Sequence, residues 1–132
     1  AAMALGADGI NMGTRFLATK EAPVHDQVKQ TIVAADELQT RLVMRPLRNT
    51  ERVMKNAAVD EILRIEQEKG ADTSIDDIRH LVTGVKGKMV LHEGKMDEAA
   101  WSCGMVAGLI HDVPTCEELI TRIVSEAESI IC

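Results

Sequence analysis

Aromatic residues are scarce in this sequence: one Trp, one Phe and no Tyr make up 2% of its 132 residues. Hydrophobic residues still account for 45% of the chain, so Leu, Ile, Val, Met and Ala must build the core. That composition is commoner in helix-rich proteins than in β-sandwiches. Nucleic-acid binders commonly stack bases on aromatic rings and need a positive surface. Because this chain has few aromatics and a net charge of −6, we expect no nucleic-acid partner.

Long hydrophobic runs and cysteine clusters are also missing. Residues 105–110 are one of the longest apolar runs, far below the ~20 residues of a membrane span. No basic region followed by an apolar one opens the sequence, so we expect a cytoplasmic protein with no membrane partner. Cys103, Cys116 and Cys132 are too few and too scattered for a disulfide framework or a zinc site. We therefore expect structural thiols and no metal.

The beginning of the sequence predicts a helix end followed by a strand. Residues 1–5 are strong helix formers, and Gly6 is typical of a helix C-terminus. Residues 9–13 then form a short run bounded by glycines, as a buried strand would be. A helix, a strand and a further helix make one step of a parallel sheet. Parallel strands need neighbours, so we expect the remaining sheet to precede residue 1.

Beyond residue 20 the pattern predicts mainly helices. One covers residues 23–35, and a second covers residues 47–69 and ends at Gly70. Residues 38–44 fit either an extended or a helical conformation. A short helix ends at Leu81 and is capped by Thr73 or Ser74. The glycines at positions 84, 87 and 94 predict loops.

Two further helices complete the prediction. Residues 96–110 are predicted as a helix in which Gly104 and Gly108 permit close backbone packing against a neighbour. The last helix, residues 115–131, follows Pro114 and opens with a capping box formed by Thr115 and Glu118. Its apolar stripe must pack on something, and consists of Leu119, Ile120, Ile123, Val124, Ala127, Ile130 and Ile131.

The turn after the predicted strand has the chemistry of a phosphate site. A phosphate needs several converging N–H donors, and a residue without Cβ lets the backbone come close. In the sequence Asn11-Met12-Gly13-Thr14, Gly13 permits that approach and the Thr14 hydroxyl adds a side-chain hydrogen bond. In TIM barrels a phosphate commonly sits in the loops after the last two strands.

Residues 6–21 (GADGINMGTRFLATKE) closely resemble the final strand of the nitronate monooxygenase family, formerly called 2-nitropropane dioxygenases. The likeness continues through His25, Lys29, residues 47–49 and residues 104–110. It covers most of this chain, but less than half of a typical member, at the C-terminal end. The same family includes FMN-dependent enoyl-acyl carrier protein reductases.

The resemblance implies an α/β fold: the C-terminal fragment of an FMN-binding TIM barrel, mostly helical with one clear short strand. Residues 1–20 would be the last barrel strand and phosphate turn, residues 21–110 a helical excursion that lids the active site, and residues 111–132 the closing helix. The FMN phosphate would be held by Asn11, Met12, Gly13 and Thr14, with Asn11 standing where Gln is usual. The family's catalytic His has no counterpart here, so we assign no catalytic residue.

By the same resemblance, the whole enzyme would oxidise alkyl nitronates with O2 to carbonyl compounds and nitrite, and the fragment alone would be inactive. Two alternatives stay open: an FMN-dependent enoyl-acyl carrier protein reductase, or a stand-alone helical module that docks through residues 119–131. Homo-oligomer formation is left open. The four histidines are expected to be structural or solvated. The one basic cluster is either a solvated face or an anion site for a phosphorylated carrier, and contains Arg41, Arg45, Arg48, Arg52 and Lys55.

Overall fold

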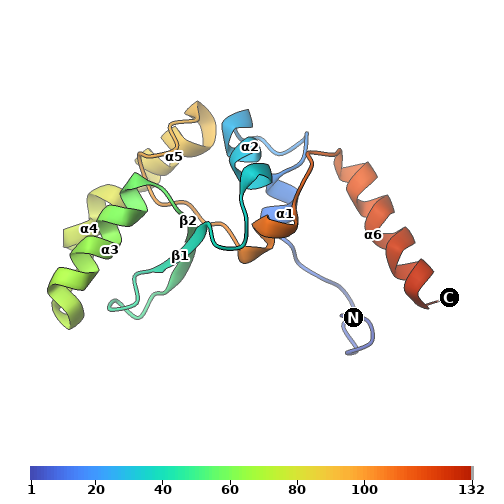
Figure 1. The fold of residues 1–132 in the computed structure, drawn as a ribbon, viewed down its shortest axis with the longest axis horizontal. Coiled ribbons are helices and arrows are strands. Elements are labelled where there is room, and N and C mark those ends of the chain that lie inside the picture. The colour runs from blue at the N-terminus through green and yellow to red at the C-terminus, as the bar shows by residue number, and fades with distance from the viewer. Residues whose placement is uncertain (132) are drawn as a thin grey trace.

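The computed structural model describes residues 1–131, so Cys132 and its predicted structural thiol lie outside the described residues. Helices dominate, and the two strands form one antiparallel hairpin near the middle of the molecule (Figure 1). The elements are α1 (Thr14–Leu17), α2 (Asp26–Ala34), β1 (Thr40–Val43), β2 (Glu51–Met54), α3 (Ala57–Lys69), η1 (Gly70–Asp72), α4 (Ile75–Val82), α5 (Gly84–Glu93), η2 (Met105–Leu109) and α6 (Cys116–Ile131).

The helix predicted to end at Gly6 is reduced to a single turn, which closes with the hydrogen bonds of a Schellman motif. The Ala7 N–H donates to the Ala2 carbonyl at 3.0 Å, and the Gly6 N–H donates to the Met3 carbonyl at 2.9 Å. Gly6 itself has φ of +84°, the left-handed conformation that this motif requires and that glycine adopts without steric cost. The preceding residues form a single turn.

The strand predicted at residues 9–13 is not present, so the expected short strand is wrong, whereas the expected mostly helical character of the chain is confirmed. Residues 9–12 have no regular secondary structure, and Gly13 begins a bend that leads into α1. A strand exists only when its backbone N–H and C=O groups pair with a neighbouring strand. No segment of residues 1–131 lies in register beside residues 9–13, so the apolar run has no ladder to join.

The ambiguous segment at residues 38–44 is extended, because it pairs as β1 with β2. The register places Thr40 opposite Met54 and Val43 opposite Glu51. The helix predicted from residue 47 is therefore wrong in its first part. Val53 and Met54 are consecutive and both buried, as in a strand covered on its two faces, whereas an amphipathic helix has one apolar face.

Side-chain caps determine where the middle helices begin. The Asn56 side chain accepts a hydrogen bond from the Val59 N–H at 2.9 Å, so α3 begins at Ala57. Ser74 and Asp77 form the capping box that opens α4, which confirms the predicted short helix. His25 caps α2 by accepting a hydrogen bond from the Gln27 N–H.

Two predictions about glycine-containing segments are wrong. Gly84 and Gly87 lie inside α5 rather than in loops; of the three predicted loop glycines, Gly94 alone ends a helix, with φ of +72°. The helix predicted over residues 96–110 is absent. Trp101, Ser102 and Cys103 alternate buried, exposed and buried, the period-two pattern of extended backbone, and Ser102 forms a bridge with Val53. Only residues 105–109 are helical, as η2.

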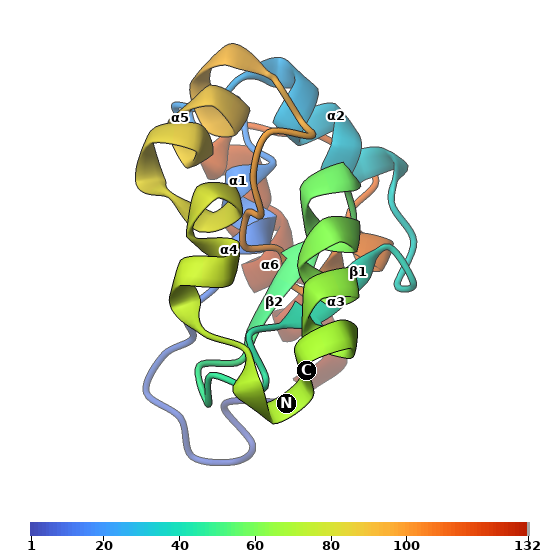
Figure 2. The same cartoon turned by 90° about the vertical axis from the view of Figure 1, so that its left-hand side faces the viewer.

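The hairpin separates two hydrophobic clusters. On one side, α3 and α4 pack Ile62 and Ile78 against Val43 and Val53. On the other side, Met54 joins a second cluster contributed by α2, α5 and residues 99–110. Figure 2 shows α3 and α4 in front, with α2 and α5 at the top. Because both of its faces are packed, the hairpin is held in a fixed position relative to these helices.

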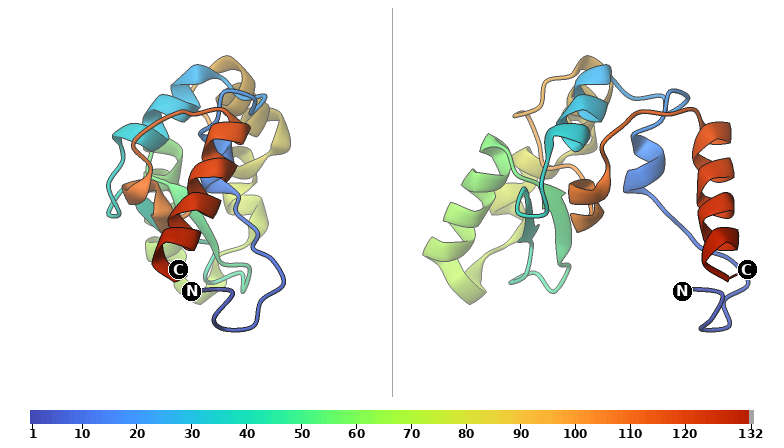
Figure 3. Two further views of the ribbon diagram at one scale, coloured as in Figure 1. Left: turned by 90° about the vertical axis from the view of Figure 1, so that its right-hand side faces the viewer. Right: turned by 45° about the vertical axis from the view of Figure 1, so that its right-hand side comes forward.

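The last helix, α6, stands apart from the two clusters. Its predicted capping box is confirmed: the Glu118 N–H donates to the Thr115 hydroxyl at 3.1 Å, and the Thr115 N–H donates to the Glu118 carboxylate at 2.7 Å. Leu119 is the one fully buried residue of the helix. Ile120 and Val124 are about half exposed, and Ile130 is 84% exposed. Ile123 and Ala127 are half-buried, and most of the remaining stripe is exposed. Figure 3 shows α6 standing at one side of the molecule.

A pair of arginines ties α6 to α1 through Asp112. Arg15 Nη1 lies 3.2 Å from Asp112 Oδ1, and Arg122 Nη2 lies 2.9 Å from Asp112 Oδ2. Partial burial raises the pKa of Asp112, but the hydrogen bond from Arg122 and the charges of Arg122 and Arg15 outweigh it and hold that pKa below its usual range.

Acid is therefore expected to loosen this link. A lowered pKa means that ionised Asp112 stabilises the fold above its unfolded pKa of about 4, and that this contribution is lost as the pH falls through the folded pKa. Asp112→Asn should lower the free energy of unfolding by about 1 kcal/mol at pH 7. Urea unfolding at pH 7 and pH 3 checks this. The difference between wild type and variant should shrink at pH 3; a difference that is equal at both pH values would contradict it.

Candidate functional site

Residues 101–104 connect the hairpin to α1. The Met54 N–H donates to the Trp101 carbonyl at 3.1 Å, and the Cys103 N–H donates to the Arg52 carbonyl at 3.1 Å. One residue further on, the Gly104 N–H donates to the Thr14 hydroxyl at 2.9 Å. Through these bonds the segment runs along β2 like a short third strand. Thr14, at the start of α1, is thereby placed next to residues about 90 positions away in the sequence.

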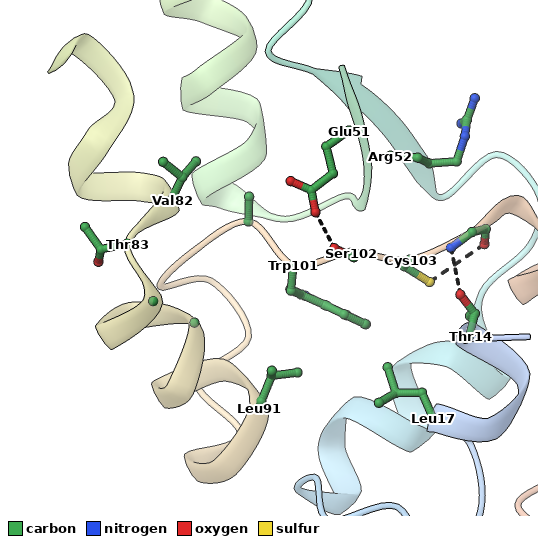
Figure 4. A pocket seen from close by; sticks show the side chains of 15 residues that line it. Thr14, Leu17, Glu51, Arg52, Val82, Thr83, Leu91, Trp101, Ser102 and Cys103 are labelled. Carbon is green, nitrogen blue, oxygen red and sulfur yellow. Dashed lines mark hydrogen bonds between the residues drawn. The ribbon is translucent and has the colours of Figure 1, made fainter. Parts of the chain in front are cut away.

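A cavity of about 630 Å³ lies beside this segment, within the usual size range of small-molecule sites. Figure 4 shows the side chains that surround it. Apolar side chains form one part of the lining: Leu17, Val82, Leu91, Ala100 and Trp101. Polar groups gather at the hairpin and α1: Glu51, Arg52, Ser102, Gly13 and Thr14. The cavity can therefore take a ligand with an apolar part and a polar or charged part.

The charged groups of the lining are partly engaged by neighbours. The Ser102 hydroxyl donates a hydrogen bond to the Glu51 carboxylate, as the dashed line in Figure 4 shows. Arg52 donates from Nη1 to the Thr40 hydroxyl at 2.9 Å and forms no ion pair within residues 1–131. The Glu51 carboxylate thus faces Ser102 at the edge of the cavity, whereas the Arg52 side chain is directed away from Trp101 and Leu91 (Figure 4).

The cavity also holds a thiol, Cys103, which is 2% exposed. Burial raises its pKa to about 11, although a hydrogen bond with Thr14 opposes that rise. The thiolate is the nucleophilic form of cysteine, so a thiol with this pKa is inert at neutral pH. Cys103 is part of the wall.

The predicted phosphate turn divides between two cavities. Gly13 and Thr14 line the 630 Å³ cavity, whereas Met12 lines a second one of about 440 Å³ with Arg15 and residues of α6. Asn11 is exposed and lines neither. The structure thus brings two of the four predicted residues to the main cavity, and their role in binding stays a prediction.

The geometry of Gly13 and its neighbours fits an anionic group such as the FMN phosphate. Gly13 has φ of −89° and ψ of −69°, which any residue can adopt, and a Cβ built on it would meet no atom within 4 Å. The space in front of it is therefore open to a ligand. No residue of 1–131 accepts a hydrogen bond from the N–H groups of Thr14, Arg15 or Phe16. Free N–H groups beside an open glycine are what a phosphate requires.

None of the four histidines lines the main cavity. His25 is a helix cap, and His80, His92 and His111 are exposed. In residues 1–131, no three His, Cys, Asp or Glu side chains come together in a way that could hold a metal ion. Nor does any helix in that range have the length and hydrophobicity to cross a membrane.

Sequence reasoning missed most of the cavity wall. The segment 96–110 was predicted as a helix, so Trp101, Ser102 and Cys103 were not seen as a wall. Glu51 and Arg52 were placed on a helix that does not form. The alternation of Trp101, Ser102 and Cys103 between apolar and polar was the signal for extended backbone.

The chain is similar to a known protein family and to two curated proteins. The nitronate monooxygenase family model matches residues 1–126. Two curated relatives are each 27% identical to the chain over 160 residues, covering 96% of it and 45% of their own length. Both are named (3aS,4S,5R,7aS)-5-hydroxy-7a-methyl-1-oxo-octahydro-1H-indene-4-carboxyl-CoA dehydrogenase, one from Rhodococcus jostii (strain RHA1) and the other from Mycobacterium tuberculosis (strain ATCC 25618 / H37Rv).

Among solved structures, FabK from Thermotoga maritima is similar with a TM-score of 0.86 and 28% sequence identity. The match covers 98% of this chain and 40% of FabK. A mutant of the same protein is similar with a TM-score of 0.76 and 25% identity, over 98% of this chain and 37% of the other. The chain thus spans less than half the length of the relatives that it matches.

Proposed function

The chain belongs to the nitronate monooxygenase family, and on that premise we propose that it forms the C-terminal part of an FMN-dependent enzyme that oxidises alkyl nitronates with O2. The products would be carbonyl compounds and nitrite. The family and the FabK likeness support a flavin-dependent oxidoreductase of this type. The choice of nitronate as the substrate is our proposal and is tested by the assays described below.

The observation that carries the proposal is the position of Gly13 and Thr14 at the edge of the 630 Å³ cavity. The turn offers free N–H groups and an open glycine, and the cavity beside it is lined largely by apolar side chains. A flavin mononucleotide has the same two-part character, a phosphate and a largely apolar ring system. One site thus provides for both ends of the cofactor.

Bound FMN would supply the redox chemistry, and the residues of this chain would position the reactants. The N–H groups of residues 14–16 would hold the phosphate. Leu17, Leu91 and Trp101 would shield the alkyl group of the substrate from water. The Ser102 hydroxyl would keep the Glu51 carboxylate hydrogen-bonded at the polar edge of the cavity.

We further propose that residues 1–20 and 111–132 close a TIM barrel in the longer protein, with residues 21–110 covering the active site. The uncovered apolar side chains of α6 and of residues 1–10 support this division, because soluble proteins rarely leave a contiguous patch of this kind in water. In this arrangement the barrel also supplies the neighbours that residues 9–13 need to form a strand.

A second candidate is a flavin enzyme that acts on acyl thioesters, such as an enoyl-acyl carrier protein reductase. Two observations favour it: the curated relatives are named for a CoA ester, and the similar solved structures are FabK. The amphipathic cavity is compatible with an acyl chain as well as with an alkyl nitronate.

Two assays on the full-length protein distinguish these candidates. The first measures O2 uptake and nitrite release with propyl-2-nitronate. The second measures NADPH or NADH oxidation with an enoyl thioester under anaerobic conditions. Nitronate-dependent O2 uptake that yields nitrite without a nicotinamide cofactor is the expected result. Thioester-dependent NAD(P)H oxidation without nitronate turnover would replace the first candidate with the second.

A further inference from the structure

The five basic side chains of residues 41–55 form a group without an acidic partner among residues 1–131; outside this group only Lys29 and Lys88 lack one there. Elsewhere, eight lysines and arginines form ion pairs. In the hairpin region no basic side chain lies within ion-pair distance of a described carboxylate, and this holds for Arg41, Arg45, Arg48, Arg52 and Lys55. In a protein with a net charge of −6, this unneutralised cluster is a place where an anion is attracted.

The structure does not support one continuous helical face for these side chains, but it brings two of them together. Arg45 and Arg48 occupy the ends of a β-turn, in which the Arg48 N–H donates to the Arg45 carbonyl at 3.0 Å. Pro46 takes the second position, where its fixed φ suits the turn. The first and fourth Cα atoms of a β-turn lie within about 7 Å of each other. Two exposed guanidinium groups can therefore reach one ligand.

The backbone around this turn is strained. Met44 has φ of +59° and Arg48 has φ of +54°, both in the left-handed region that side chains disfavour. The Met44 N–H donates to a Glu66 carboxylate oxygen at 2.5 Å, and the Asn49 N–H donates to the Met44 carbonyl at 3.3 Å. These bonds hold the turn in a conformation that it would not otherwise favour. Strain of this kind clusters at ligand-binding segments.

The turn is connected to the main cavity by a short piece of chain. Glu51 and Arg52, at the start of β2, line that cavity. Arg52 follows Arg48 by four residues, which span at most about 14 Å when extended. A ligand could therefore occupy the cavity with one end and reach the turn with the other.

We propose that the Arg45–Arg48 turn binds the phosphate groups of a ligand whose other end enters the cavity beside Arg52. The shared chemistry is a phosphate ester or pyrophosphate, which two arginines bind through charge-assisted hydrogen bonds. Its source is either a dinucleotide reductant or a CoA thioester. Binding of the other end of the ligand in the cavity rests on the proposed function, whereas binding of its phosphate at the turn does not.

The test measures binding by calorimetry to the full-length protein, first with inorganic pyrophosphate and then separately with NADP⁺ and coenzyme A. The variants are Arg45→Gln and Arg48→Asn, chosen because asparagine tolerates the positive φ of residue 48. Lys88→Gln is the matched control, since Lys88 is exposed on α5 and forms no ion pair with residues 1–131. Arg45→Lys retains the charge and should keep part of the affinity. Flavin content and thermal midpoint are measured for each preparation.

Each hairpin variant should weaken pyrophosphate binding about tenfold, because a hydrogen bond to a charged group is worth about one such factor. Lys88→Gln should bind as wild type does. The coenzyme whose affinity falls in parallel identifies the source of the phosphate. Wild-type affinity in both folded hairpin variants, or a wild-type protein that binds no pyrophosphate, would overturn the proposal. A protein without flavin that still binds pyrophosphate through the turn would refute the proposed function alone.

Discussion

Replacing Gly13 with glutamate is expected to weaken FMN binding about a hundredfold or more while leaving the stability of the fold unchanged. The side chain would occupy the open space in front of the free N–H groups and place a carboxylate where the phosphate should lie. Losing two charged hydrogen bonds alone accounts for that factor. The fold should tolerate the change, because residue 13 has an ordinary φ and its Cβ would meet nothing within 4 Å.

Fluorescence titration of FMN with the full-length apoprotein measures this effect. Gly13→Ala should give an intermediate loss, since it adds a Cβ without a charge. Gln67→Glu provides the control for charge, because it adds one negative charge on the exposed face of α3. The prediction fails if Gly13→Glu binds FMN as tightly as Gln67→Glu does, or if its affinity falls only because the protein has unfolded.

Replacing Gly108 with alanine should lower the free energy of unfolding by about 3 kcal/mol. A Cβ on Gly108 would lie 2.6 Å from the Glu37 backbone nitrogen and 3.2 Å from the Asp36 carbonyl carbon. Backbone atoms cannot rotate away as a flexible side chain can. The added methyl group would therefore push η2 away from residues 36–37, which follow α2. Ala107 and Ile110 belong to the same hydrophobic cluster as Trp101, so that shift should also disturb the cavity wall.

Chemical denaturation of the full-length protein tests the effect, with Gly87→Ala as the matched control. Gly87 lies in α5 and a Cβ there would meet no atom within 4 Å. Alanine in a helix interior is about 0.5–1 kcal/mol more favourable than glycine, so this control should stabilise slightly. Equal effects of the two substitutions would show that Gly108 is not the site of a close backbone approach.

Local signals in the sequence were sufficient for several elements. Ser74 and Thr115 mark helix starts through hydrogen bonds within a few residues, and both starts are confirmed. Gly6 closes a turn in the left-handed conformation expected of it, although no helix precedes it. Gly108 was expected to allow close backbone packing, and it does, although in η2 rather than in a long helix. These features depend on local geometry, so one sequence suffices to predict them.

The hairpin and the cavity wall depend on distant partners, and there the sequence was misleading. Val53 and Met54 fit a helical pattern, but pairing with β1 and burial on both faces makes them a strand. Residues 9–13 show the reverse case: a run with the composition of a strand forms none because residues 1–131 give it no neighbour. Trp101 and Cys103 become cavity residues only through their bonds to β2.

The phosphate turn itself was predicted as four residues, of which the structure places Gly13 and Thr14 at the main cavity. The sequence could not show that Asn11 and Met12 lie away from this cavity, because the bend at Gly13 determines which side of the chain each residue faces. Whether any of the four binds FMN is the question on which the proposed function depends.

Hydrogen–deuterium exchange of the full-length apoprotein, with and without FMN, addresses that question most directly. The account predicts that FMN slows exchange at the N–H groups of Thr14, Arg15 and Phe16, which have no acceptor in residues 1–131, and at the neighbouring residues 101–104. FMN that binds tightly while exchange at residues 14–16 stays unchanged would contradict it.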